Sequence, residues 1–142
     1  DEFSIDETIK AMVTETTGGL ALFIGIVRRK SASENVTRIT PELYYEAYES
    51  MAYEKMAQIA MEIRERWSTV ERIALIQRIG KLSAGTPAAL IACSASHRDT
   101  GIFDAARYGI DRLKEIAPIW QKELSENGEI WVEGNYYPKP SD

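Results

Sequence analysis

Residues 88–117 read AALIACSASHRDTGIFDAARYGIDRLKEIA and hold the clearest structural signals in the chain. The continuous apolar run over 88–93 predicts a buried strand. After it, apolar residues recur at spacings of three and four, which predicts a helix with one buried face. These residues are Phe103, Ala106, Ile110, Leu113 and Ala117. Asp99 or Thr100 is expected to cap the start of this helix, and Pro118 is expected to bend the chain after it.

His97 and Arg98 lie where the strand ends and the helix begins, a position at which backbone N–H groups and the helix dipole favour an anion. Lys114 lies near the other end of the helix, and the bend at Pro118 is expected to bring Lys122 back towards it. Each residue also has an ordinary structural role, as a hydrogen-bonded histidine, a surface arginine or a helix-terminal lysine. The residues alone leave both interpretations open, and only their combination around one strand–helix unit indicates a functional site.

The chain before this region begins with a predicted short helix. Ser4 and Glu7 have the spacing of a capping box, which predicts a helix that starts at Ile5, includes Val13 and is stopped by the glycines at 18–19. The apolar segment 20–27 predicts a central strand. The basic residues 28–30 that follow it form either a solvated turn or one wall of an anion site.

Further strands are expected at 39–48, 72–79 and 129–133, and a long amphipathic helix at 50–67. Pro41 indicates an edge or a bulge near the start of the 39–48 strand. Gly80 and Gly85 mark a turn, and residues 134–142 are expected to form an extended, flexible tail. This order of elements predicts an α+β fold with a mostly antiparallel or mixed sheet and helices packed on one side.

The composition is that of one domain over residues 1–142, with 44% hydrophobic and 27% charged residues. The net charge of −5 argues against nucleic-acid binding, and no apolar run approaches the roughly 20 residues that cross a membrane. One cysteine excludes an internal disulfide and indicates a reducing compartment, so we expect a cytoplasmic location. A single histidine and one cysteine within an apolar run argue against a metal site.

Several stretches, taken in order, resemble the large, catalytic subunit of molybdopterin synthase. They are 19–28 (GLALFIGIVR), 43–52 (LYYEAYESMA), 78–82 (RIGKL), 94–98 (SASHR), 113–114 (LK), 117–123 (APIWQKE) and 131–133 (WVE). Each stretch is a weak signal alone, whereas the ordered set is specific and covers nearly the whole chain. The resemblance implies a fold like the α/β hammerhead with additional packed helices.

The same resemblance implies a reaction and its partners. Members of that family add two sulfurs to a cyclic pyranopterin monophosphate, which forms the dithiolene of molybdopterin in molybdenum cofactor biosynthesis. The sulfur arrives as a thiocarboxylate on the C-terminal glycine of a small ubiquitin-like carrier subunit. The chain is therefore expected to be a sulfurtransferase without a cofactor, and a homodimer that binds two carriers in a heterotetramer. A pocket of arginine and lysine residues suits both anionic reactants.

The substrate-binding set that the resemblance implies is Ile26, Val27, Arg28, His97, Arg98, Lys114, Gln121, Lys122 and Glu123. Within this set, Arg28 is expected at the phosphate, and the pair His97 and Arg98 is expected to come from the other subunit of the dimer. Lys114 matches the family's essential lysine and is expected to be the main catalytic residue, with Lys122 as the second catalytic candidate.

Three positions depart from the family pattern. Gln121 stands where the family has its second active-site lysine, and on a helix the neighbouring Lys122 points about 100° away from it. Gln77 and Asn135 stand where the family often has a histidine and an arginine. These departures leave open a family member that binds the carrier but has lost turnover. A domain that binds only a small anion is the third interpretation.

Overall fold

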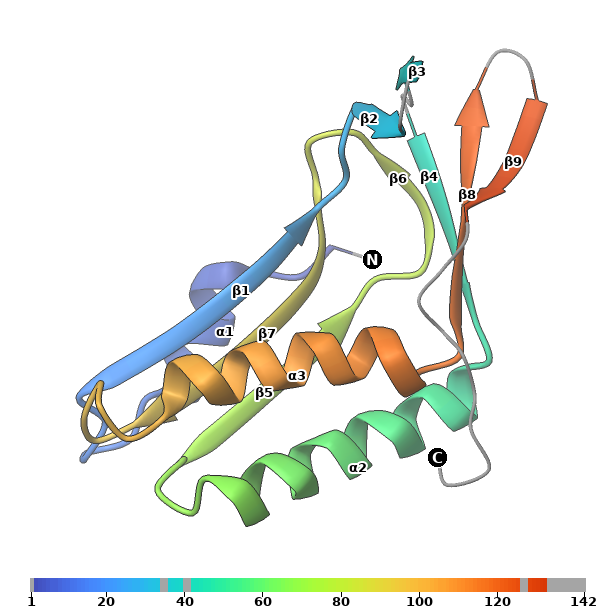
Figure 1. Cartoon of the computed structure of the whole chain (residues 1–142). Helices are drawn as coiled ribbons and strands as arrows, with labels where there is room; N and C mark the ends of the chain where they lie inside the picture. Colours follow the sequence, from blue (N-terminus) through green and yellow to red (C-terminus); the bar gives the residue numbers. More distant parts are fainter. Residues whose placement is uncertain (1, 34–35, 40–41, 126–127, 133–142) are drawn as a thin grey trace.

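The computed structural model describes residues 2–33, 36–39, 42–125 and 128–132. Its elements are α1 (Ile5–Met12), β1 (Gly19–Ile26), β2 (Lys30–Ser33), β3 (Val36–Ile39), β4 (Glu42–Ala47), α2 (Glu49–Arg66), β5 (Arg72–Gln77), β6 (Gly80–Ser83), β7 (Pro87–Ala95), α3 (Ile102–Ile116), β8 (Ile119–Ser125) and β9 (Gly128–Val132). The strands form a sheet β1–β7–β5, a sheet β6–β4–β8–β9 and a β2–β3 ribbon (Figure 1). All pairings in the described part are antiparallel, which confirms the predicted α+β class.

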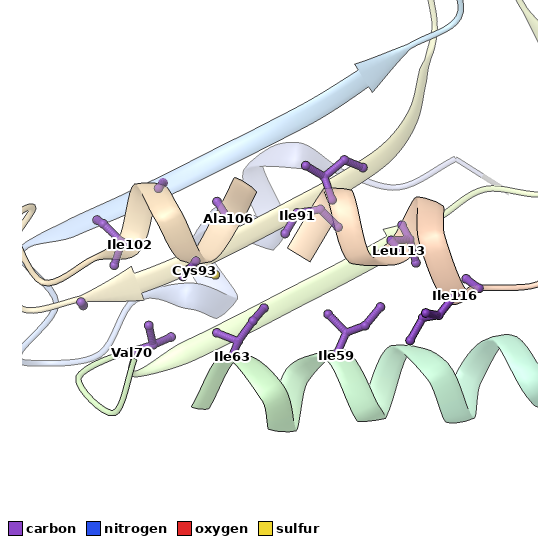
Figure 2. Close-up of a cluster of buried hydrophobic side chains, with 14 residues drawn as sticks. Ile59, Ile63, Val70, Ile91, Cys93, Ile102, Ala106, Leu113 and Ile116 are labelled. Carbon is purple, nitrogen blue, oxygen red and sulfur yellow. The ribbon is translucent and has the colours of Figure 1, made fainter. Parts of the chain in front are cut away.

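Strand β7 lies in the middle of the three-stranded sheet and is covered on both faces. Leu90 and Ala92 pack on the side of Met12 in α1. Ile91 and Cys93 point to the other face, into the cluster between the sheet and helices α2 and α3 (Figure 2). Because neither face meets solvent, the strand is continuously apolar instead of alternating, as the 88–93 run predicted.

Two expectations about this sheet are wrong. The apolar run at 20–27 predicts a central strand, but β1 pairs with β7 alone among the described strands and lies at an edge. Helices were expected on one side, but α1 covers the face opposite to α2 and α3 (Figure 1). The apolarity of β1 carries no information on how many strands pair with it, and Phe23 and Ile26 in this strand are 42% and 50% exposed.

The predicted helix starts are partly confirmed. Ser4 caps α1 by accepting a hydrogen bond at Oγ from the amide of Glu7, at 3.2 Å. The helix ends at Met12 rather than at the glycines, and Val13 is 51% exposed instead of lying on its apolar face. Helix α2 confirms the prediction at 50–67 to within one residue at each end.

Helix α3 begins differently from the prediction. Its N-cap is Gly101, with a left-handed φ of +88°, and no side chain caps the helix. Thr100 was expected to cap it, but its hydroxyl donates to the carbonyl oxygen of His97 at 2.7 Å. The expected bend at Pro118 is confirmed, because the chain turns extended at Ala117 and enters β8.

The four-stranded sheet joins the first sheet through a second apolar cluster. Val27, Tyr45, Leu82 and Ala88 form it, and Ile119 packs against them. Strand β4 pairs with β6 on one side and β8 on the other, so its described part is not an edge. Gly80, expected in a turn, opens β6, while Gly85 lies in the turn that follows. Strand β9 confirms the strand expected at 129–133, whereas Pro41 and residues 134–142 lie outside the described residues.

Candidate active site

The predicted site residues lie at two opposite ends of α3. His97 and Arg98 belong to the loop between β7 and α3, and both side chains are exposed. Lys114 lies in the last turn of the helix. Lys114 lies twelve positions after Ile102, which corresponds to about 18 Å along a helix axis. The structure of one chain therefore does not bring His97 and Arg98 together with Lys114.

Strand β1 runs in the same direction as α3, away from the His97–Arg98 loop. Gly19 at its start lies against the side chain of Ile102, the first residue of α3. The strand then passes alongside the helix towards the end that carries Lys114 (Figure 1). Arg28 follows the end of β1 and is exposed, so Arg28 and Lys114 lie towards the same end of the chain.

Val27 belongs to the implied substrate-binding set, but the structure gives it a structural role. Its side chain is 2% exposed, its amide donates to the carbonyl of Thr86 at 3.0 Å, and its carbonyl accepts from the amide of Gly85 at 2.8 Å. With these groups occupied, Val27 fixes the direction of its exposed neighbours Ile26 and Arg28 and has little left to offer a ligand. Ile26 is 50% exposed.

A pocket of about 370 Å³ opens beside this anchored residue. Its lining residues are Val27, Arg29, Ser83, Ala84 and Gly85. Arg29 supplies the positive charge of the lining. The sequence assigns Arg29, within residues 28–30, to a solvated turn or to one wall of an anion site. It does not predict this pocket, because the pairing of the 83–86 turn with Val27 is a long-range contact without a local signal.

Lys114 has an exposed side chain and an amine with a lowered pKa. Its side chain reaches solvent, but protein atoms surround the amine, and this desolvation lowers the pKa of Lys114 below 10.5. A lysine with a lowered pKa holds its proton less firmly and can serve either as an acid/base group or as a cation beside a developing negative charge.

Gln121, Lys122 and Glu123 lie on a strand, which corrects the helical geometry assumed for them. In β8 successive side chains point to opposite faces of the sheet. Gln121 lies opposite Tyr45, on the face that packs into the apolar cluster with Val27. Lys122 lies opposite Tyr44, with its ammonium 5.1 Å from the centre of that ring. Lys122 therefore points away from the face of Gln121 and does not take the place of a lysine at 121.

Glu123 shares the face of Gln121 and is 9% exposed. Its register partners are Leu43 in β4 and Ile130 in β9. Of the three implied site residues in β8, the two on the inward face are thus one neutral hydrogen-bonding amide and one acid.

Cys93 is fully buried in the core below α3, and burial raises the pKa of its thiol to about 11. A thiol in this state is protonated at neutral pH and inaccessible, so it is a poor sulfur donor. No group of three histidine, cysteine or acidic side chains in the described residues gathers as metal ligands. No helix of the described residues has the length and apolarity to cross a membrane.

Comparison with known proteins identifies the family. The family described as "MoaE protein" matches residues 1–116. The chain belongs to this family. A molybdopterin synthase catalytic subunit from Halalkalibacterium halodurans is 44% identical over 128 residues, which cover 90% of this chain and 78% of that protein. MoaE family membership thus agrees with the resemblance found in the sequence.

Solved structures of MoaE-type proteins share the fold. The crystal structure of molybdopterin synthase from Staphylococcus aureus has a TM-score of 0.82 and 37% identity, and the match covers 92% of this chain and 91% of that chain. A complex of subunits 1 and 2 of molybdopterin-converting factor from Helicobacter pylori contains a chain with a TM-score of 0.70 and 20% identity, covering 94% and 82% of the two chains. The second match supports the fold alone.

Proposed function

We propose that this protein is the catalytic subunit of a molybdopterin synthase. It transfers sulfur from the C-terminal thiocarboxylate of a small ubiquitin-like carrier to a cyclic pyranopterin monophosphate and forms the dithiolene of molybdopterin. The observation that carries this proposal is the family membership together with Lys114, a solvent-reaching lysine whose pKa is lowered by burial. The buried thiol of Cys93 supports an external source of sulfur. Its compartment is the cytoplasm, in keeping with the single cysteine.

Each residue of the proposed site has one role. Arg28 binds the phosphate of the pterin, and Ile26 beside it provides an apolar contact. Lys114 stabilises the negative charge that develops as sulfur leaves the carrier. Gln121 donates hydrogen bonds where the family has a lysine. Lys122 is left out of catalysis, because β8 directs it to the other face.

A complete site requires two copies of the chain. The length of α3 separates His97 and Arg98 from Lys114 within one chain, beyond the combined reach of the side chains. A second copy, related by a twofold axis, supplies His97 and Arg98 to the Lys114 end of the first, and the reverse exchange completes a second site. The assembly is then a homodimer with two equivalent sites and one carrier at each.

The test is conversion of the cyclic pyranopterin monophosphate by this protein mixed with thiocarboxylated carrier. We expect dithiolene product, and the carrier with an ordinary C-terminal carboxylate is the matched control that gives none. A protein that binds the carrier but makes no product under any condition supports the non-catalytic alternative, which Gln121 motivates. A protein that binds neither carrier nor pterin contradicts the proposal.

A further inference from the structure

The loop that carries His97 and Arg98 is held in place at both of its ends by one short segment, residues 67–71. At the far end of the loop, the hydroxyl of Thr69 donates to the carbonyl of Thr100 at 3.1 Å. Gly101 packs so closely on the indole of Trp67 that a Cβ at this position would overlap it. The segment between α2 and β5 thus fixes the place where the loop enters α3.

The near end of the loop is held through the carboxylate of Glu71. Three hydroxyls donate to this carboxylate: those of Thr14 and Thr17 to Oε2 at 2.7 and 2.6 Å, and that of Thr16 to Oε1 at 2.9 Å. The three threonines belong to the turn between α1 and β1. They hold the Glu71 pKa below its ordinary value of 4.5, Thr17 contributing most.

This turn leads directly to the backbone behind His97. The amide of Gly18 donates to the carbonyl of Ala95 at 3.0 Å, and a Cβ on Gly18 would overlap the carbonyl oxygen of Ser96. Glu71 also binds the end of β7 itself, because its amide donates to the carbonyl of Ser94 at 2.7 Å. The contacts form a closed path from Glu71 through the threonines and Gly18 to Ser96, and back through Ser94.

We propose that Glu71 is a positioning residue for the anion-binding pair His97 and Arg98, acting through the threonine turn and Gly18. This inference rests on the proposed function, in which the pair completes the site of the neighbouring subunit, and on its place in the implied substrate-binding set. Both side chains are exposed, so their direction depends on the backbone of the loop. A carboxylate that accepts three hydroxyl donors fixes that backbone without itself reaching the substrate.

The test compares Glu71→Ala with Glu71→Gln, which keeps one accepting oxygen, and with Glu65→Ala on the surface of α2 as the matched control. We expect Glu71→Ala to raise the KM for the pterin substrate about three- to tenfold at nearly unchanged kcat. Glu71→Gln should restore part of this loss, and Glu65→Ala should behave as the wild type. In an Arg98→Ala background, which lacks turnover, the effect of Glu71→Ala on the dissociation constant for the pterin substrate should largely disappear, because the two changes then act on the same contact.

An unchanged KM in a folded Glu71→Ala variant overturns the proposal, and so does an equal loss of affinity for the pterin substrate with or without Arg98. If Glu71→Ala does not fold, Thr17→Val removes one donor and takes its place in the same comparison. Amide hydrogen exchange over residues 96–101 gives a readout that needs no activity. If the wild type proves inactive, the proposed function fails, whereas faster exchange in Glu71→Ala than in Glu65→Ala still supports the positioning role and equal exchange overturns it.

Discussion

Lys114 combines a solvent-reaching side chain with an amine whose pKa is lowered by the surrounding protein. If the reaction uses the ammonium form, the rate should fall as the pH rises through the Lys114 pKa, which lies below 10.5. Lys114→Ala should reduce conversion about 100- to 1000-fold, the usual cost of losing a group that stabilises developing charge.

The pH–rate profile of Lys114→Arg shows whether residue 114 acts through its positive charge or by transferring a proton. Arginine stays protonated across the accessible pH range, so the alkaline fall should vanish if the residue acts through its charge. Loss of all activity in Lys114→Arg, with the fold intact, points instead to an acid/base role. Normal turnover in Lys114→Ala contradicts any catalytic role for this residue.

Gln121 and Lys122 are adjacent in sequence but lie on opposite faces of β8, which leads to opposite predictions for the two positions. Gln121→Lys should increase the rate of conversion, because it adds a cation on the inward face. Lys122→Ala should leave the rate within about twofold and cost about 0.5–1 kcal/mol of unfolding free energy for the contact with the ring of Tyr44.

Steady-state rates and urea unfolding curves of both variants provide the measurement. A large loss of rate in Lys122→Ala at unchanged stability would contradict the assignment of faces. The sequence could not supply this assignment, because the resemblance identifies the residues of 117–123 but a helix and a strand place residue 122 differently. Pro118 ends α3, and the pairing of β8 with β4, a segment about 75 residues away, then selects the strand.

Helix α3 packs tightly against β7 at Gly109. A Cβ there would lie 2.8 Å from Cγ2 of Ile91 and 3.4 Å from Cδ1 of Ile63. Gly109→Ala gains about 1 kcal/mol in helix propensity, while overpacking of a close-packed core costs about 1–3 kcal/mol. Because Cγ2 of Ile91 lies next to the backbone of a central strand and cannot move far, we expect net destabilisation.

The midpoint of urea unfolding measures this balance, and Gly85→Ala is an informative comparison. Gly85 has open space around its Cβ position but a φ of +86°, so its variant loses stability through backbone conformation alone. A stabilised Gly109→Ala would show that α3 can move away from β7. Because α3 has residues of the two proposed sites at its two ends, such a shift should also change activity.

Helices and strands with a clear apolar pattern could be predicted from the sequence. Which elements pack or pair with each other could not. The apolar spacing of α2 and the unbroken run of β7 reflect burial directly. The edge position of β1 depends on which strand pairs with it, and the cap of α3 depends on Trp67 leaving room only for Gly101. The contacts of Glu71 with three threonines more than 50 residues away are likewise invisible to local patterns.

The proposed exchange of residues between subunits can be tested by complementation, because Arg98 and Lys114 lie at opposite ends of α3. If each site takes Lys114 from one subunit and Arg98 from the other, both Lys114→Ala and Arg98→Ala homodimers have two defective sites. In a mixed dimer, the Arg98→Ala subunit supplies Lys114 and its partner supplies Arg98, so one site is intact and the other has lost both residues. Random mixing makes about half of the dimers mixed, which predicts recovery of about a quarter of the wild-type activity.

Equal amounts of the two inactive variants should therefore regain activity after they are unfolded and refolded together, and not when each is refolded alone. The double variant Lys114→Ala/Arg98→Ala, refolded with the wild type, is the matched control: its mixed dimers carry one defect in every site and add no activity. If the two single variants stay inactive together while mixed dimers are present, both residues act within one chain. The separation of about 18 Å along α3 would then have to be closed by a rearrangement of the loop rather than by a second subunit.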